Sequence, residues 1–414
     1  MKRKNDGLAY KQNGMQKDDN KKRVLMVASV ASMIDQFNMS NICMLQQMGY
    51  EVHVACNFQG GNTCNIERIQ KFQKILIQMG IVWHQWDCPR SIQPIWRCAR
   101  AYQELLKLLK KDPFVWMHCH SPIGGALARI AAHQWNVSHR HKIRVIYTAH
   151  GFHFYKGAPL RNWLLYYPVE KLIARWTDVL ITVNQEDYCR AKRCLQADKI
   201  FYIPGVGIDT QRYAACMKIG LDDMHPGREF RKKYGIEENA LVLLSVGELS
   251  KRKNHQIVIS ALAALHRKDV YYVICGQGDQ RKALAKQACR LGVSSYVRMP
   301  GFIEDMQEFY QNADIFVFPS IQEGMPVALM EAMAAGLPCV VSDIRGNREL
   351  ISREGGRLYE QNNMEQLMEA VAELLDDSKL RVLCGSFNLQ KIKQYDSKKV
   401  NARMQTIYRE QGCG

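Results

Sequence analysis

Two glutamates with seven residues between them could bind different parts of one ligand through their carboxylates. Glu323 follows the apolar run IFVFPS, and Glu331 lies two turns into the Ala-rich helix expected next. Pro326 suits the first turn of that helix, where its missing N–H costs nothing. The segment expected to face the ligand is Gly324, Met325, Pro326 and Val327, in which every residue except Pro326 carries a backbone N–H. Such a helix N-terminus favours an anion such as a diphosphate.

A simpler interpretation of the same segment is a capped helix whose Glu331 is solvated. The helix dipole favours an acidic residue such as Glu323 near the N-terminus without any ligand. Against this, Glu331 has apolar neighbours on both sides, which is unusual for a solvated helix face.

Three consecutive cations follow another apolar run. Lys251, Arg252 and Lys253 come shortly after LVLLSV, where they could offset the charge of a diphosphate leaving group. A solvated loop is the alternative.

Gly276 lies in the sequence CGQGD after the next apolar run, and glycine there lets the backbone approach a ligand, although a simple turn explains it equally well.

Histidines follow two apolar runs in the first half of the chain. His150 comes directly after RVIYTA and is placed to act as a hydrogen-bond donor or proton carrier at the end of a strand. His120 occupies a similar position one strand earlier. The alternative for both is a packed structural histidine.

The elements that must position these residues alternate between short apolar runs and helix-like segments, which is typical of parallel sheets with crossover helices. Strands are expected near residues 24–30, 52–55, 81–84, 115–118, 145–148, 179–183 and 200–203, and again near 241–246, 271–275, 297–299, 315–318 and 339–342. Residues 31–34 are expected to be a loop. The two series predict two doubly wound domains that meet near PGVGID at residues 204–209. Ligands bind at the carboxyl ends of such strands.

The composition is that of a folded protein with enough apolar residues for two cores. The chain has 414 residues, of which 47% are hydrophobic and 23% charged. It has no run long enough to span a membrane and no apolar segment typical of a secretory signal near its N-terminus. Fourteen scattered cysteines, without zinc-ligand spacing, favour reduced thiols in the cytosol.

The net charge of +17 is concentrated in the first half of the chain. Residues 1–208 contain 29 Lys and Arg against 14 Asp and Glu, whereas residues 209–414 contain 28 against 26. This distribution favours an anionic partner, either a nucleic acid or an anionic membrane surface. Composition alone leaves both open.

The segment 91–111 combines apolar and basic residues at helical spacing. It is predicted to be either a crossover helix packed on the sheet or a helix lying on a membrane surface. Its apolar positions are Ile92, Ile95, Trp96, Ala99, Tyr102, Leu105, Leu106 and Leu109, and we expect Trp96, Tyr102 and Leu109 to insert in the second case.

Together these motifs resemble glycosyltransferase family 4, the retaining, nucleotide-sugar-dependent enzymes of GT-B fold, from Lys22 onward. The motifs are the E-x7-E pair continued by EAMAAGLPCVVSD, the phrases VGELSKRKN, ICGQGD, GVGIDTQRY and GREFRKKYGI, and, nearer the N-terminus, HCHSPIGGALARIAA and TAHGFHF. The last two are similar to members that build bacterial capsular, exopolysaccharide or lipid-linked glycans.

The resemblance implies two Rossmann-like domains facing each other across a cleft. We expect a basic tail at 1–22, an acceptor-binding domain at 23–208, a nucleotide-sugar-binding domain at 209–385, and C-terminal helices at 386–414 packing back toward the first domain. It also implies transfer from a UDP-sugar to a lipid-linked or polysaccharide acceptor at the inner face of the membrane. No metal, other cofactor or nucleic acid is expected.

Roles for individual residues also come from this resemblance. Glu323 would contact the donor sugar, Glu331 the ribose, Lys253 and Arg252 the diphosphate, and Gly276 the nucleotide. His150 would point toward the transferred sugar, and His120 and His153 are candidates on the acceptor side. The chain departs from the family where Glu248 replaces an arginine common five residues before the lysine, and where residues 31–37 lack a glycine-rich loop.

Two other functions are compatible with parts of the pattern. A GT-B epimerase would bind a UDP-sugar without an acceptor and would not need a basic first domain. A nucleic-acid-binding protein would account for the net charge but leave the paired glutamates unexplained.

Overall fold

The computed structural model describes residues 21–91, 93–214 and 227–411. They form two compact units, which we describe separately. The first comprises residues 21–182, 187–202 and 404–411, and the second comprises 183–186, 203–214 and 227–403. The chain therefore passes between the units at residues 202–203, slightly before the predicted boundary. Residues 386–403 belong to the second unit, and only the last turns of the C-terminal helix belong to the first.

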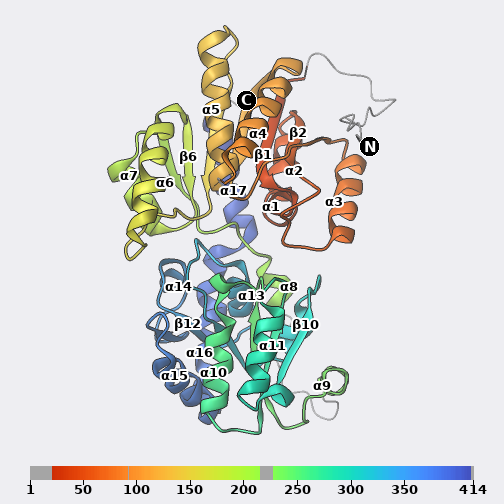
Figure 1. The fold of residues 1–414 in the computed structure, drawn as a ribbon, viewed down its shortest axis with the longest axis vertical. Helices are drawn as coiled ribbons and strands as arrows, with labels where there is room; N and C mark the ends of the chain where they lie inside the picture. Colours follow the sequence, from red (N-terminus) through yellow and green to blue (C-terminus); the bar gives the residue numbers. More distant parts are fainter. Residues whose placement is uncertain (1–20, 92, 215–226, 412–414) are drawn as a thin grey trace. The chain divides into compact units, whose positions relative to one another are not determined.

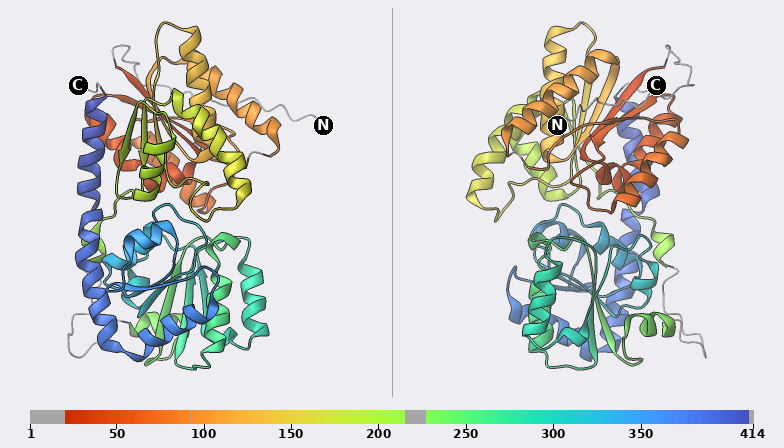
Figure 2. Two further views of the ribbon diagram at one scale, coloured as in Figure 1. Left: turned by 90° about the vertical axis from the view of Figure 1, so that its left-hand side faces the viewer. Right: turned by 45° about the vertical axis from the view of Figure 1, so that its right-hand side comes forward.

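The first unit is built on a parallel sheet of seven strands in the order β3-β2-β1-β4-β5-β6-β7. Figures 1 and 2 show helices on both of its faces. The strands are β1 (Arg23–Val30), β2 (Glu51–Asn57), β3 (Val82–Gln85), β4 (Phe114–His120), β5 (Arg144–Ala149), β6 (Val179–Thr182) and β7 (Lys199–Tyr202). The central strands β1 and β4 are buried along nearly their whole length because both faces of the sheet are covered.

The helices of the first unit connect successive strands. They are α1 (Ala31–Phe37), α2 (Met39–Gln47), α3 (Ile66–Gln78), α4 (Ile95–Lys111), α5 (Pro122–Ser138), α6 (Leu160–Ile173) and α7 (Gln185–Cys194), with a short 3₁₀ turn, η1 (Ala174–Trp176), after α6. The core on one face of the sheet joins residues of β4 and β5 to buried side chains of α4 and α5.

The second unit repeats the same winding in a parallel sheet of six strands, ordered β10-β9-β8-β11-β12-β13. Its strands are β8 (Leu241–Val246), β9 (Val270–Cys275), β10 (Val297–Gly301), β11 (Ile315–Phe318), β12 (Cys339–Ser342) and β13 (Gly356–Tyr359). Both orders follow the doubly wound pattern, in which the chain reverses direction beside its first strand. The expected fold class is confirmed for each unit.

Short and medium helices flank the second sheet. They are α8 (Thr210–Ala214), α9 (Arg228–Tyr234), α10 (His255–Ala264), α11 (Arg281–Arg290), α12 (Gln307–Gln311), α13 (Val327–Ala334), α14 (Arg345–Leu350), α15 (Met364–Asp376), α16 (Ser378–Ile392) and α17 (Ser397–Glu410). Three 3₁₀ turns, η2 (Lys251–Lys253), η3 (Ser294–Tyr296) and η4 (Lys393–Tyr395), complete the unit.

Two local expectations from the sequence are wrong. Residues 31–34 belong to α1, which begins directly at the end of β1 and leaves no loop. The edge strand β13 was not predicted, because GRLY lacks an apolar run. Gly356 is required there, since a Cβ would lie 2.0 Å from the carbonyl oxygen of Cys339 on the neighbouring strand.

The segment 91–111 forms one crossover helix, α4, which begins at Ile95 rather than at residue 91. Leu109 is buried in the core and Tyr102 packs against that core, so the expectation that both insert into a membrane is wrong. Ile95 and Trp96 are exposed at the start of the helix. Ile92 lies outside the described residues. Among the helices that the structure describes, none is long and apolar enough to cross a membrane.

Candidate functional site

The candidate site of the second unit lies where β8 and β11 are neighbours, although 72 residues separate their paired positions. This is the point at which the strand order reverses, and ligands of doubly wound sheets bind at such points. The chain leaves β8 into the turn that contains Arg252 and Lys253 and leaves β11 into the segment that contains Glu323.

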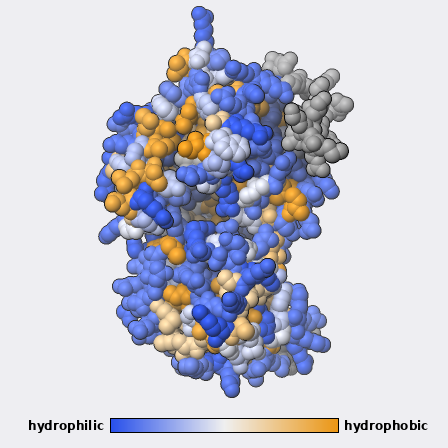
Figure 3. All heavy atoms as spheres, viewed as in Figure 1, coloured by the Kyte–Doolittle hydropathy of each residue, from blue (hydrophilic) through white to orange (hydrophobic). Residues whose placement is uncertain are grey.

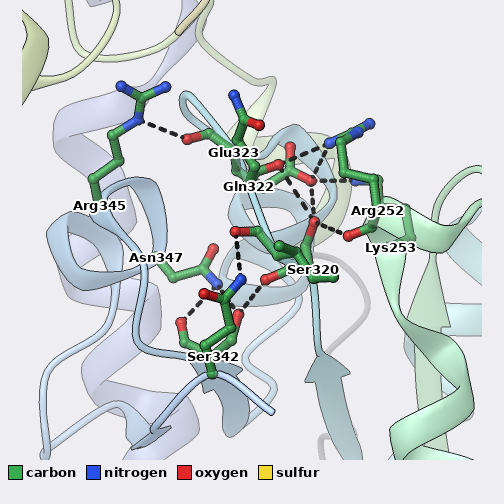
Figure 4. A network of polar contacts seen from close by, with 10 residues as sticks. Arg252, Lys253, Ser320, Gln322, Glu323, Ser342, Arg345 and Asn347 are labelled. Atoms are coloured by element: carbon green, nitrogen blue, oxygen red, sulfur yellow. Dashed lines mark hydrogen bonds and ion pairs between the residues drawn. The ribbon is translucent and has the colours of Figure 1, made fainter. Parts of the chain in front are cut away.

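Glu323 forms ion pairs with both predicted cations. Its Oε1 lies 2.8 Å from Nζ of Lys253 and 2.8 Å from Nη1 of Arg252. Figure 4 shows the two basic side chains converging on the carboxylate. Lys253 Nζ also lies 4.5 Å from the centre of the Phe318 ring, which adds a cation–π contact. Three residues chosen from the sequence therefore form one cluster.

The charges of this cluster depend on one another. Burial alone would raise the pKa of Glu323, but Lys253 and Arg252 outweigh it and hold that pKa below the ordinary value. Burial lowers the pKa of Lys253, and the nearby carboxylates of Glu323 and Glu248 oppose that change. Glu248 thus makes a small contribution to keeping Lys253 charged.

Residues far apart in the sequence fix the backbone around Glu323. Arg252 donates from Nη1 to the carbonyl oxygen of Gln322 at 2.8 Å, and the buried Arg345 donates from Nε to the carbonyl oxygen of Glu323 at 3.1 Å. Below them, Asn347 donates to the carbonyl oxygen of Ser342 at 2.9 Å (Figure 4). Arg345 and Asn347 could not be predicted from the sequence, because nothing near them in the chain indicates these contacts.

Helix α13 begins one residue later than expected. Pro326 is its N-cap, and Val327 is its first residue, so the proline precedes the first turn instead of lying within it. Gly324 packs against the start of α14: a Cβ on Gly346 would lie 2.5 Å from its carbonyl oxygen. Met325 is buried at the same turn.

Glu331 is partly buried and held by two tyrosines, which argues against the simpler interpretation of a freely solvated side chain. Its Oε1 accepts a hydrogen bond from the hydroxyl of Tyr213 at 3.0 Å, and its Oε2 accepts one from Tyr310 at 2.9 Å. Burial raises the pKa of Glu331, and the two tyrosines and Arg212 partly counteract this. Neither tyrosine was predicted from the sequence, since Tyr213 comes from α8 and Tyr310 from α12.

The glycines after β9 allow two backbone segments to touch. Gly276 has a φ of +152° and Gly278 of +159°, and Cβ atoms there would lie 1.8 Å from the carbonyl oxygen of Gly247 and 2.3 Å from that of Leu249. Hydrogen bonds of 2.9 Å from Gly247 N to Cys275 O and from Leu249 N to Gln277 O join the same segments. This contact supports the loop that carries Lys253 and explains Gly276 without a nucleotide.

The predicted histidines His120 and His150 lie in the first unit and form a pair in which His120 is buried and His150 is partly exposed. Nε2 of His150, just after β5, is hydrogen-bonded to Nδ1 of His120 at 3.0 Å. Burial lowers the pKa of His150 to about 4 and that of His120 well below the ordinary value. Both rings are therefore neutral at pH 7, so His150 can donate or accept a hydrogen bond but does not supply a positive charge.

His153 lies apart from this pair and lines a cavity of about 290 Å³ within the first unit. The cavity lies beside the reversal point of the first sheet and is lined by Ser29, Val30, Ser32, Met33, Gln36, Phe37, Thr63, Arg90, Ser121, Pro122, Ile123, His153 and Tyr166. Its lining combines hydroxyl, amide, imidazole and guanidinium groups with apolar side chains. Among the described residues, no group of three or more His, Cys, Asp or Glu side chains is placed to hold a metal ion.

Comparison with known proteins finds glycosyltransferase profiles in both halves of the chain. The sequence profile described as Glycosyltransferase Family 4 matches residues 42–212, and the profile described as Glycosyl transferases group 1 matches residues 227–389. The chain is 36% identical over 338 residues to a Bacillus subtilis protein named "Putative glycosyltransferase EpsD", covering 81% of this chain and 82% of that one.

A second relative comes from Escherichia coli. It is the UDP-Gal:alpha-D-GlcNAc-diphosphoundecaprenol alpha-1,3-galactosyltransferase, 31% identical over 287 residues, which are 67% of this chain and 71% of the relative.

Solved structures show the same fold. The structure of HepE from Anabaena in complex with UDP and glucose superposes with a TM-score of 0.72 at 17% identity, over 94% of this chain and all of that one. WaaG, described as a glycosyltransferase involved in lipopolysaccharide biosynthesis, superposes with a TM-score of 0.69 at 20% identity, over 93% and 99% of the two chains. This chain belongs to the GT-B glycosyltransferases of the family 4 type.

Proposed function

We propose that this glycosyltransferase moves a sugar from a UDP-sugar to a lipid-linked glycan acceptor during synthesis of a cell-surface polysaccharide such as an exopolysaccharide or capsule. The observation that carries the donor half is the cluster of Glu323, Lys253 and Arg252 at the reversal point of the second sheet. It combines two cations suited to a diphosphate with a carboxylate suited to sugar hydroxyls.

The comparisons support both substrates. HepE was crystallised with UDP and with UDP-glucose. The Escherichia coli relative and a Campylobacter jejuni relative, 29% identical over 52% of this chain, are named for acceptors carried on diphospho-undecaprenol. A lipid-linked acceptor would bring the enzyme to the inner face of the membrane.

In the proposed reaction the bond between the anomeric carbon and the diphosphate oxygen breaks, the oxygen of an acceptor hydroxyl bonds to that carbon on the same face, and the hydroxyl proton passes to the leaving UDP. Lys253 and Arg252 stabilise the leaving UDP by charge, the largest contribution that such a site can make. Glu323 orients the sugar through its hydroxyls. Glu331, held by two tyrosines, is assigned to the ribose, because a carboxylate can accept hydrogen bonds from the ribose hydroxyls.

We assign to His150 a hydrogen bond to the transferred sugar, as the family resemblance implies. Its low pKa makes the neutral ring the working form. Retention of the anomeric configuration, through front-face substitution and without a metal, completes the proposal. Neutralisation of the diphosphate by Lys253 and Arg252 is consistent with a reaction that needs no metal.

The test is transfer itself. A thermal-shift screen of nucleotide-sugars selects the donor, which is then incubated with diphosphoundecaprenol-linked sugars, with and without EDTA, and the new linkage is assigned by NMR. We expect UDP-linked donors to stabilise the protein and an α-linked product to form from an α-linked donor in EDTA. An inverted product contradicts retention, and loss of product in EDTA contradicts the metal-free reaction.

Two alternatives are not favoured. An epimerase would convert a UDP-sugar in the absence of acceptor, so incubation with donor alone distinguishes it. A nucleic-acid-binding protein would leave unexplained the ion-paired cluster and the agreement with transferases along both halves of the chain.

A further inference from the structure

Helix α6 exposes large apolar side chains along its outer face. The exposed fraction is 73% for Leu160, 68% for Leu164, 65% for Leu165 and 51% for Leu172, and Val169 is also exposed. Hydrophobic residues gather over the part of the first unit that carries α6 (Figures 1 and 3). A contiguous apolar surface of this kind marks a contact with another molecule or a membrane.

The opposite face of α6 packs against the first unit through specific contacts. The exposed leucines are therefore not the face that the helix uses to pack on the core. Glu170 forms a buried bidentate ion pair with Arg129 of α5, at 2.6 and 2.9 Å. Arg129 also lies 3.8 Å from the centre of the Tyr147 ring. Trp163 and Tyr167 pack against the core on the same side as Glu170. The helix is apolar on both sides, and only one side is covered within this unit.

The exposed charges around α6 are positive. Arg161 and Lys171 are its exposed charged residues, because its one carboxylate, Glu170, is buried. Lys156 before the helix and Arg175 after it are also exposed. Basic residues beside inserted apolar side chains are typical of helices that lie in the interface of an anionic bilayer. A second copy of the same positive surface would be repelled.

We propose that α6 docks this protein on an anionic phospholipid membrane, with Leu160, Leu164, Leu165 and Leu172 inserted below the headgroups. This deepens the proposed function and rests on it, since it names the surface through which a lipid-linked acceptor is reached. Tyr166 of the same helix lines the cavity that contains His153. A lipid whose chain lies beside α6 would therefore present its polar end near that cavity.

The proposal replaces α4 as the membrane surface. In α4 the exposed apolar side chains are Ile95 and Trp96 at one end, whereas in α6 they run the length of the helix. Equal exposure elsewhere supplies a matched control: Val382 and Leu383 on α16 are 68% and 67% exposed.

The experiment compares flotation of the full chain with vesicles of phosphatidylethanolamine and phosphatidylglycerol and with vesicles of phosphatidylcholine. The variants are Leu164→Ser with Leu165→Ser, the control Val382→Ser with Leu383→Ser, and Ile95→Ser with Trp96→Ser. We expect the α6 variant to lose at least about tenfold in partitioning to anionic vesicles, since two inserted leucines are removed. The α16 control should bind as the wild type does.

Several results overturn the proposal. One is that the α6 variant binds anionic vesicles as well as the wild type does, and another is that the α16 control loses as much binding as the α6 variant. A third is loss of binding in the α4 variant alone. A fourth is that high salt abolishes binding while the leucine substitutions leave it unchanged. Conversion of a dimer to a monomer by the α6 changes, seen by gel filtration, would instead assign the face to a second copy. UDP binding by calorimetry separates the two levels: a wild type that floats without binding UDP contradicts the proposed function, not the docking surface.

Discussion

At the scale of single residues, the candidate site is neutralised in part by its own charges. Glu323 contacts both cations proposed to bind the diphosphate, so the incoming donor competes with this carboxylate for Lys253 and Arg252. The three residues could be predicted from their types and their places after apolar runs. Arg345 and Tyr310 could not, because each acts on a glutamate about twenty residues away through tertiary packing alone.

Replacing Lys253 by alanine should weaken UDP binding by about 10- to 150-fold. A hydrogen bond to a charged group is worth roughly 1.5–3 kcal/mol, and each 1.4 kcal/mol corresponds to about tenfold in affinity. Titration calorimetry with UDP measures it. Lys251→Ala is the matched control, since Lys251 belongs to the same 3₁₀ turn but is exposed. Equal affinities for the two variants would remove Lys253 from the diphosphate site.

At the scale of elements, the sequence predicts what is regular and misses what depends on neighbours. Twelve strands could be predicted from their β-branched or aliphatic runs, and their parallel order followed from the alternation with helices. The strand β13 escaped prediction because its pairing with β12 depends on a glycine that fits against the neighbouring backbone. The apolar outer face of α6 was also missed, since a sequence does not show which side of an apolar helix is covered.

The ion pair that attaches α6 should be important for stability. Glu170→Gln keeps the shape of the side chain but leaves the buried Arg129 without a counter-charge, which should cost about 3–5 kcal/mol in the free energy of unfolding. Denaturant unfolding followed by far-UV circular dichroism measures the loss. The control Glu238→Gln breaks an exposed pair with Arg228 and should change stability by less than about 0.5 kcal/mol. A loss no larger than the control's would show that the buried pair does not hold α6.

At the scale of the whole molecule, buried histidines should make the fold sensitive to acid. Burial lowers the pKa of six histidines: to about 4 for His84 and His150, to about 3 for His118 and His255, and below the ordinary value for His53 and His120. Below pH 6.5 the unfolded chain takes up protons that the folded chain excludes, so stability falls as the pH drops toward 4.

Each unit of difference in pKa is worth about 1.4 kcal/mol, and six groups act in the same direction. Glu331 and Asp178, whose pKa values burial raises, act in the opposite direction above their ordinary pKa values, but they are two groups against six. The melting temperature should therefore fall steadily between pH 7 and pH 5. A melting temperature that is constant or rises over this range would contradict the neutral, buried state of these histidines.

The most direct test of the central claim, that Glu323 orients the donor sugar beside a cationic diphosphate site, is the transfer rate of Glu323→Gln measured together with its affinity for UDP. The glutamine keeps the shape of the side chain but removes the charge that engages Lys253 and Arg252. We predict that kcat falls by at least about 10²-fold while UDP binds no more weakly than to the wild type, because its cations are released from the carboxylate. Glu369→Gln, an exposed change on α15, should alter neither quantity. Wild-type turnover in a folded Glu323→Gln variant would contradict the assignment.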